Sequence, residues 1–145
     1  MSETVIEEGL KIEDIRYQVM NYVRSKLPVY KTWSDDNLND LIKFYMDLGQ
    51  CLISEGNDGN IDGVLALQFV DKVEDRNVME NKRDGEGVFI DIFIAKTKQV
   101  REKLVWQAIS ISGVRKWIAF ERCKYGQRAS KLPWKFAERI ASYGW

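Results

Sequence analysis

Two carboxylates lie in segments whose pattern predicts β-strands, and they are the first candidates for acid–base chemistry. Asp91 interrupts the apolar run Val88–Ala95, and Glu121 lies in the segment Lys116–Cys123. A carboxylate that is buried in an apolar strand is able to act as a general base. The alternative for Asp91 is a strand-end residue that accepts hydrogen bonds from the preceding loop. Glu121, or its neighbour Arg122, is alternatively a structural salt-bridge partner.

Histidine is absent from the 145 residues, and the two cysteines are Cys51 and Cys123. The absence of histidine excludes the usual hydrolase triads and most zinc and iron sites. Neither cysteine lies in a Cys-x-x-Cys spacing, so we expect no disulfide scaffold and no metal site. Cys123 would be a nucleophile only if a lysine, a carboxylate or a helix terminus activated it. Otherwise it is a small buried residue.

The net charge is zero, with 22 basic and 22 acidic residues. This balance argues against a nucleic-acid partner, because such binding depends on neutralising phosphates. The C-terminal part is basic with interleaved aromatic residues, a nucleic-acid pattern whose scatter here favours a solvated face or a protein partner. The sequence has no apolar run long enough to span a membrane and no signal-peptide core. We therefore expect a cytoplasmic protein without membrane contact.

Hydrophobic spacing and turn residues predict the elements that position these groups. The predicted helices are Ile12–Leu27, a second helix capped by Ser34 and closed by Gly49, Lys98–Ile111, and a closing helix within Ser130–Ser142. The predicted strands are Gln50–Glu55, Ile61–Asp71, Val88–Ala95 and Lys116–Cys123. The polar segment Lys72–Gly87 is the longest predicted loop, and a loop of this length is mobile or functional.

This order predicts a single α/β (α+β) domain over residues 1–145. An antiparallel three-strand meander would end in Val88–Ala95, and a strand–helix–strand crossover would place Lys116–Cys123 parallel to it. Apart from Asp91, the run Val88–Ala95 is apolar on both faces, which is typical of a central strand covered on both sides. We therefore expect a mixed sheet with helices on both faces.

The element order from Ile12 to Cys123 resembles the GNAT family of N-acetyltransferases, in which two helices precede an antiparallel meander and a crossover helix. The resemblance implies acetyl transfer from acetyl-CoA to an amine, with Asp91 or Glu121 as the base. It also implies that backbone groups of the central strand hold the pantetheine arm and that the helix start holds the pyrophosphate. The implied cofactor-binding residues are Phe93, Ile94, Ala95, Lys96, Lys98, Gln99, Val100 and Arg101.

Tyr125 lies just past the last predicted strand, where some members of the family use a tyrosine as a general acid. The alternative is an aromatic residue that covers the edge of the core.

The junction Lys96–Lys103 carries four basic residues but none of the glycines of the family's Gln/Arg-x-x-Gly-x-Gly/Ala loop. The stretch Tyr125–Trp145 is also too short for the further helix and two strands of the usual family members. The run Trp117–Arg122 with its polar continuation, together with Leu132–Phe136, looks like the small acetyltransferase-like proteins that phages encode. These departures favour a second hypothesis, a non-catalytic structural or interaction module on the same fold, such as a phage virion or accessory component. Its protein partner would bind the C-terminal aromatic residues, which alternatively complete the core. These aromatic residues are Trp134, Phe136, Tyr143 and Trp145.

Overall fold

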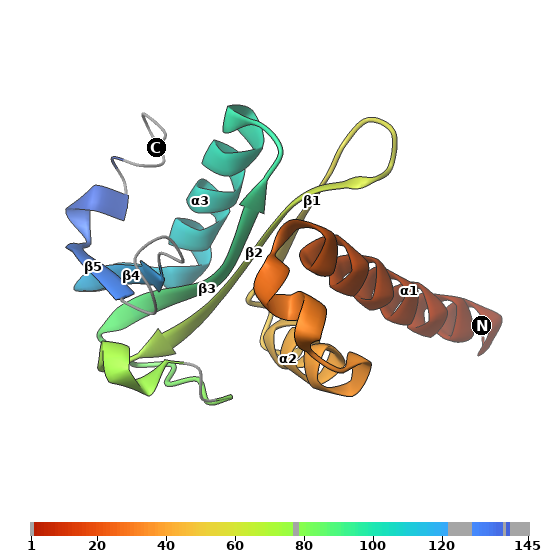
Figure 1. The fold of residues 1–145 in the computed structure, drawn as a ribbon, viewed down its shortest axis with the longest axis horizontal. Helices are drawn as coiled ribbons and strands as arrows, with labels where there is room; N and C mark the ends of the chain where they lie inside the picture. Colours follow the sequence, from red (N-terminus) through yellow and green to blue (C-terminus); the bar gives the residue numbers. More distant parts are fainter. Residues whose placement is uncertain (1, 77–78, 122–128, 138, 140–145) are drawn as a thin grey trace.

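A five-stranded mixed sheet forms the centre of the fold (Figure 1), in a computed structural model that describes residues 2–76, 79–121, 129–137 and 139. The strands lie side by side in chain order: β1 (Cys51–Glu55), β2 (Ile61–Val70), β3 (Gly87–Ala95), β4 (Trp117–Glu121) and β5 (Ala129–Pro133). The pairs β1–β2, β2–β3 and β4–β5 are antiparallel, whereas β3 and β4 are parallel. The predicted meander and crossover are therefore confirmed.

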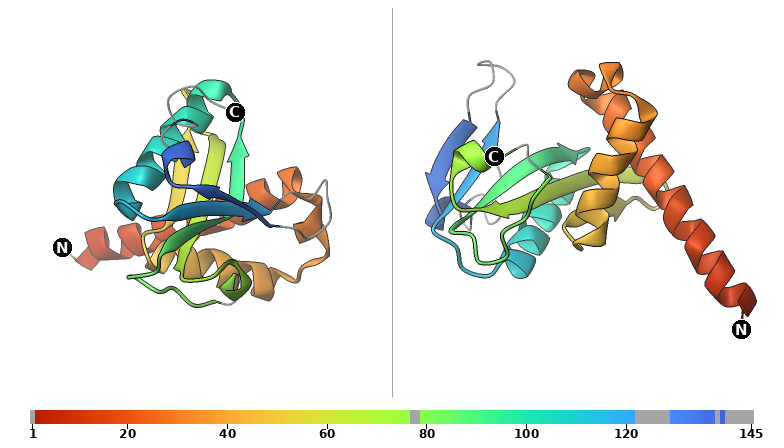
Figure 2. Two further views of the ribbon diagram at one scale, coloured as in Figure 1. Left: turned by 90° about the vertical axis from the view of Figure 1, so that its left-hand side faces the viewer. Right: turned by 90° about the horizontal axis from the view of Figure 1, so that it is seen from below.

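Helices cover both faces of this sheet (Figure 2). Helix α1 (Ser2–Lys26), the 3-10 helix η1 (Pro28–Thr32) and helix α2 (Asp35–Asp47) lie on one face, and helix α3 (Lys98–Ser112) lies on the other. The apolar core is divided accordingly. Buried side chains of α1 and α2 pack on Val64, Ala66 and Ile92, while Leu104 and Ala108 of α3 pack on the opposite face. The prediction of helices on both faces is confirmed.

Helix α1 begins ten residues before the predicted start at Ile12, at Ser2. The apolar spacing starts only near Ile12, so the polar first half gives no periodic signal. The first half reaches beyond the sheet (Figures 1 and 2).

The predicted closing helix within Ser130–Ser142 is wrong in its first part, because Ala129–Pro133 forms β5. These residues pair with β4 from Trp117 opposite Pro133 to Glu121 opposite Ala129. Pro133 was a reasonable signal for a helix start. It is equally tolerated as the last residue of an edge strand, where its missing N–H costs little. Helical backbone follows at Lys135.

The segment between β2 and β3, predicted as a loop, holds a short 3-10 helix η2 (Val73–Asp75) and is anchored to the sheet. Lys82 donates its backbone N–H to the Phe69 carbonyl at 2.8 Å, and Asn81 Oδ1 accepts the N–H of Phe69 at 2.8 Å. Arg115 reaches from beyond α3 and donates to the carbonyls of Arg83 and Gly85, each at 2.8 Å. The described residues of this segment are therefore held at several points.

Candidate functional site

The parallel strands β3 and β4 part in the middle of the sheet. Their pairing runs from Gly87 opposite Trp117 to Ile90 opposite Phe120. Strand β3 then continues through Ala95, five residues past Ile90, toward the start of α3 (Figure 1). At about 3.3 Å per residue, this leaves roughly 16 Å of β3 that is not paired with β4.

A β-bulge lies at the point where the strands part. Ala66 of β2 is opposite Ile92, but the next residue, Leu67, is opposite Ile90, so Asp91 is the extra residue. Ile90 packs in the core on the α3 side, whereas Ile92 packs in the core beneath α1 and α2. In a regular strand these two residues would share a face. The bulge therefore changes the direction of the side chains beyond Ile90.

Asp91 is partly buried and accepts a hydrogen bond from the hydroxyl of Tyr45 in α2, with 2.6 Å between Oη and Oδ2. Tyr45 is only 1% exposed. Burial raises its pKa well above the usual value, and the negative charge of Asp91 raises it further. Tyr45 therefore keeps its proton and is a hydrogen-bond donor to Asp91. The donor lies in α2, and Asp91 lies in the middle of β3 rather than at a strand end.

Glu121 occupies the corresponding position on the other strand. It follows Phe120, the partner of Ile90, just as Asp91 follows Ile90. The two predicted acid–base residues thus stand on the two strands at their parting, by the placement of their backbones. The structure does not describe the side chain of Glu121, and Arg122, Cys123 and Tyr125 lie outside the described residues.

Helix α3 begins at the far end of the unpaired part of β3. Thr97 is its N-cap, and its Oγ1 accepts the N–H of Val100 at 3.2 Å. The N–H of Lys96 donates to the Asp62 carbonyl, and that of Arg101 donates to the Thr97 carbonyl. The amides of Lys98 and Gln99 remain at the end of the helix, where the dipole favours an anion.

Basic side chains surround this helix start. Lys96, Lys98 and Gln99 are exposed, and Arg101 is partly buried. The Nε of Arg101 is shielded from solvent and has no hydrogen-bond partner among the described residues. The Nζ of Lys98 lies 3.8 Å from the Oε1 of Glu102, and this carboxylate offsets part of the positive charge at the helix start. The predicted basic residues are thus brought together, and they are chemically suited to a phosphate group.

Three of the predicted cofactor residues point their side chains into the core. Val100 packs against the α3 side of the sheet, as does Phe93, while Ile94 packs beneath α1 and α2. The amide of Val100 is also occupied by Thr97, so Val100 offers neither group to a ligand. Phe93, Ile94 and Ala95 could meet a ligand mainly through their backbone.

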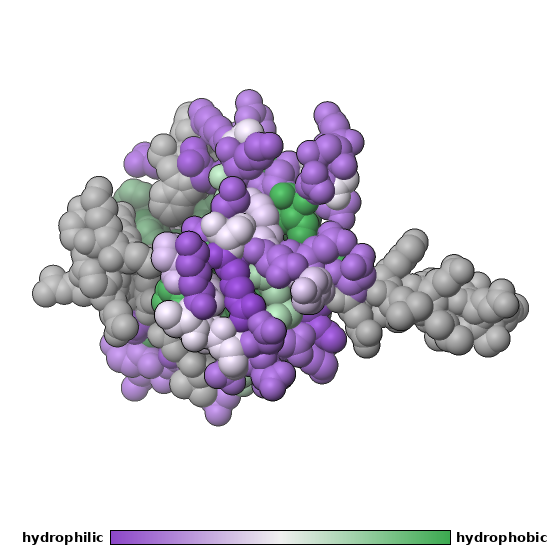
Figure 3. All heavy atoms as spheres, turned by 45° about the vertical axis from the view of Figure 1, so that its right-hand side comes forward, coloured by the Kyte–Doolittle hydropathy of each residue, from purple (hydrophilic) through white to green (hydrophobic). Residues whose placement is uncertain are grey.

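The predicted aromatic partner surface is only partly described. Trp134 packs against the core on the α3 side, and Phe136 is partly buried. Tyr143 and Trp145 lie outside the described residues. The face in Figure 3 is mostly hydrophilic, with apolar side chains in small separate areas.

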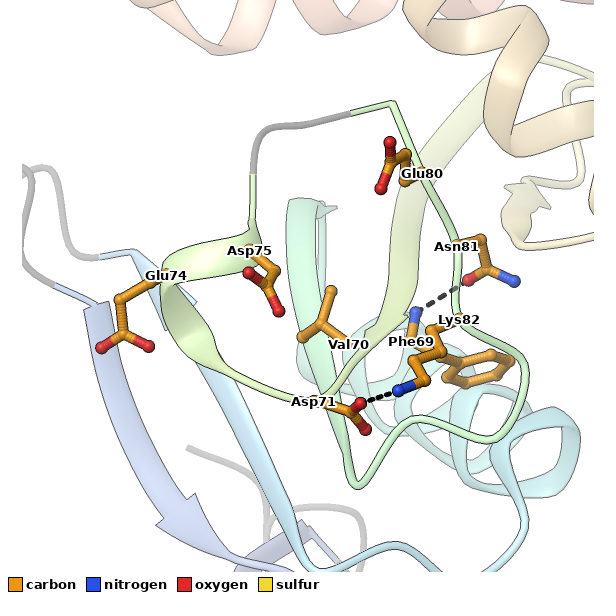
Figure 4. A pocket seen from close by; sticks show the side chains of 8 residues that line it. All are labelled: Phe69, Val70, Asp71, Glu74, Asp75, Glu80, Asn81 and Lys82. Atoms are coloured by element: carbon orange, nitrogen blue, oxygen red, sulfur yellow. Dashed lines mark hydrogen bonds and ion pairs between the residues drawn. The ribbon is translucent and has the colours of Figure 1, made fainter.

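An acidic pocket of about 360 Å³ lies at the opposite end of β3, beside Val70 (Figure 4). Lys82 contacts Asp71 in an ion pair and lowers the pKa of that carboxyl, while Asp71 raises the pKa of Lys82. The other carboxylates of the pocket are Glu74, Asp75 and Glu80. Sequence reasoning did not identify this pocket, although these residues lie next to or within the long polar segment Lys72–Gly87.

Within the described part of the chain, no group of three or more acidic, cysteine or histidine side chains is arranged to hold a metal ion. No helix among the described residues is both long enough and apolar enough to cross a membrane.

The sequence was also compared with known proteins. No protein-family model matches the chain, and no curated protein is significantly similar to it.

Proposed function

We propose that this chain is an acetyltransferase-like protein that binds acetyl-CoA along the part of β3 beyond Ile90 and transfers the acetyl group to an amine. The observation that carries the proposal is the parting of β3 from β4 immediately before the bulge at Asp91. A strand edge released from its neighbour can hydrogen-bond an extended amide-containing arm. The basic start of α3 lies at the end of the same edge.

Each part of the ligand has a candidate partner. The backbone of β3 up to Ala95 would hold the pantetheine amides. Lys96, Lys98 and Arg101, with the amides of Lys98 and Gln99, would hold the pyrophosphate. Arg101 fits this role through its guanidinium, which is partly buried at the helix start and matches the geometry of a phosphate.

Asp91 would take the proton that the amine loses, with Glu121 as the second candidate base and Tyr125 as the candidate general acid. Bound acetyl-CoA would supply a thioester whose carbonyl carbon forms the new C–N bond as its C–S bond breaks and the coenzyme leaves as a thiol. The amine proton passes to the carboxylate, and the general acid supplies the proton that the leaving thiolate gains.

Isothermal titration with coenzyme A and acetyl-CoA tests the binding. We expect binding that the charge reversals Lys98→Glu and Arg101→Glu weaken at least about tenfold, since two phosphate contacts are replaced by repulsion. Lys31→Glu is the matched control, because it makes the same charge change on an exposed residue of η1. Absence of binding at millimolar coenzyme A would refute the proposal.

A non-catalytic interaction module on the same fold is the second candidate. The observation that favours it is that the backbone N–H groups of Lys96, Val100 and Arg101 already donate hydrogen bonds within the protein. The helix start at which they lie also contains no glycine. A module of this kind would form a stable complex with a protein partner and would not bind coenzyme A. Sedimentation and titration together discriminate the two candidates.

A further inference from the structure

The bulge at Asp91 coincides with a partly buried polar contact that links two layers of the molecule. The Tyr45 hydroxyl comes from α2, and its acceptor is the one residue of β3 that has no opposite residue on β2 between Ile90 and Ile92. Tyr45 is itself surrounded by the core beneath α1 and α2, which includes Leu41, Ile42 and Ile92. A polar contact in such surroundings has few alternative partners and is therefore specific in geometry.

We propose that Tyr45 is a positioning residue that holds Asp91, and through Asp91 the bulge, in the conformation that makes β3 leave β4 after Ile90. In a regular strand, Asp91 would lie on the opposite face from both Ile90 and Ile92. The bulge instead places Asp91 and Ile92 on the same side, where the Tyr45 hydroxyl donates to the carboxylate beside the apolar layer. The hydrogen bond thus favours the bulged conformation.

Tyr45 has this role in the free protein, and the role bears on the proposed function because the same strand edge would bind the coenzyme. Tyr45 itself makes no contact with a substrate. Its hydroxyl is buried and keeps its proton, so it acts only through Asp91.

Amide hydrogen exchange, measured by NMR on the full chain without ligand, tests the inference. In Tyr45→Phe we expect the amides of Asp91 and Ile92 to exchange at least about tenfold faster than in the wild type, while those of Val88 and Phe89 change much less. Asp91→Leu should have the same local effect. Asp91→Asn should not, because its carbonyl oxygen still accepts from Tyr45.

The double variant Tyr45→Phe/Asp91→Leu should exchange no faster at Ile92 than Asp91→Leu alone, since the bond from Tyr45 is already lost in that single variant. Tyr17→Phe is the control for the loss of a hydroxyl, because Tyr17 is 63% exposed. Equal acceleration at all four amides, or no change at Asp91 and Ile92, would overturn the inference.

A measurement on the wild type removes the dependence on variants that fold poorly. A hydroxyl held in this bond should give a slowly exchanging proton resonance near neutral pH, with nuclear Overhauser contacts to the side chain of Ile92. Its absence would overturn the inference. None of these readouts involves coenzyme A, so a failure to bind the coenzyme would refute the proposed function alone.

Discussion

Gly63 of β2 lies directly beneath Val100 of α3, so closely that a methyl group at position 63 would come within 2.5 Å of Val100 Cγ1. The same methyl would lie 2.9 Å from Leu104 Cδ1 and 3.1 Å from the carbonyl oxygen of Ile94. The absence of a side chain at Gly63 therefore allows the first turn of α3 to pack onto the sheet. This contact determines how closely the basic start of α3 packs against the sheet.

Gly63→Ala should consequently destabilise the protein by about 1–3 kcal/mol, the usual cost of overpacking. The added methyl must push Val100 and Leu104, and with them the start of α3, away from β2. Urea unfolding measures the effect. Gly63→Ala should cost less stability when it is introduced into the Val100→Ala variant than when it is introduced into the wild type. The reason is that Val100→Ala has already removed the atom nearest to the added methyl group. Equal losses in both backgrounds would contradict this account of the contact.

Thr97→Ala should lower the free energy of unfolding by about 1 kcal/mol, because the N–H of Val100 loses its capping acceptor. Thr97→Ser keeps the hydroxyl oxygen and should retain most of the stability. Chemical denaturation of the three proteins under the same conditions makes the comparison. A serine variant as unstable as the alanine variant would show that the methyl group of Thr97, rather than its cap, supports the helix.

Tyr45→Phe should make the protein less sensitive to alkaline pH. The pKa of Tyr45 is raised above its usual value of 10.0, so the unfolded chain releases this proton while the folded chain retains it. Stability from this group is present below pH 10 and is lost as the pH rises above 10, by about 1.4 kcal/mol per pH unit. Asp91, Tyr30 and Cys51 are the titratable groups that act on Tyr45.

Urea unfolding at pH 9 to 11.5 should therefore give a steeper loss for the wild type than for Tyr45→Phe. Cys51 contributes the same slope to both proteins and does not alter the difference. Parallel slopes would mean that the Tyr45 hydroxyl ionises in the folded protein as it does in water.

Cys51 should be unreactive in the folded protein. Burial raises the pKa of its thiol to about 12, and the thiolate is the nucleophilic form. A rise of the pKa from 9.0 to about 12 lowers the thiolate fraction at pH 8 about 1,000-fold. Alkylation of the folded protein should therefore be slower by a similar factor than alkylation of the protein unfolded in urea. Iodoacetamide labelling of a Cys123→Ser variant, followed by mass spectrometry, isolates Cys51. Rapid labelling without denaturant would contradict the raised pKa of its thiol.

The sequence predicts the sheet better than the site. The two-sided apolar run around Asp91 correctly indicates a central strand, and Ser34 caps helix α2 as predicted. Such local signals depend on residues that are close in the chain. The contact between Tyr45 and Asp91 joins residues 46 positions apart, and the strand periodicity assumes no bulge. Neither the contact nor the bulge could be read from the local sequence pattern. Strand β5 could not be read from it either, because its residues form a strand by pairing with β4.

The directions of individual side chains at the start of α3 could not be read from the sequence. The resemblance implied Val100 as a cofactor-binding residue, and the helix turns its side chain toward Gly63. The role of Lys96, Lys98 and Arg101 toward a phosphate stays a prediction. The partial burial of Arg101 beside the exposed Lys98 is visible only in the packed structure.

The central claim is that the part of β3 beyond Ile90 and the start of α3 together bind coenzyme A. Backbone NMR spectra of the full chain, recorded during a titration with coenzyme A, test this most directly. The account predicts that the amides of Phe93, Ala95, Lys98 and Gln99 shift in proportion to occupancy, while those around the acidic pocket at Asp71 do not. Shifts confined to the acidic pocket, or no shifts at millimolar coenzyme A, would contradict it.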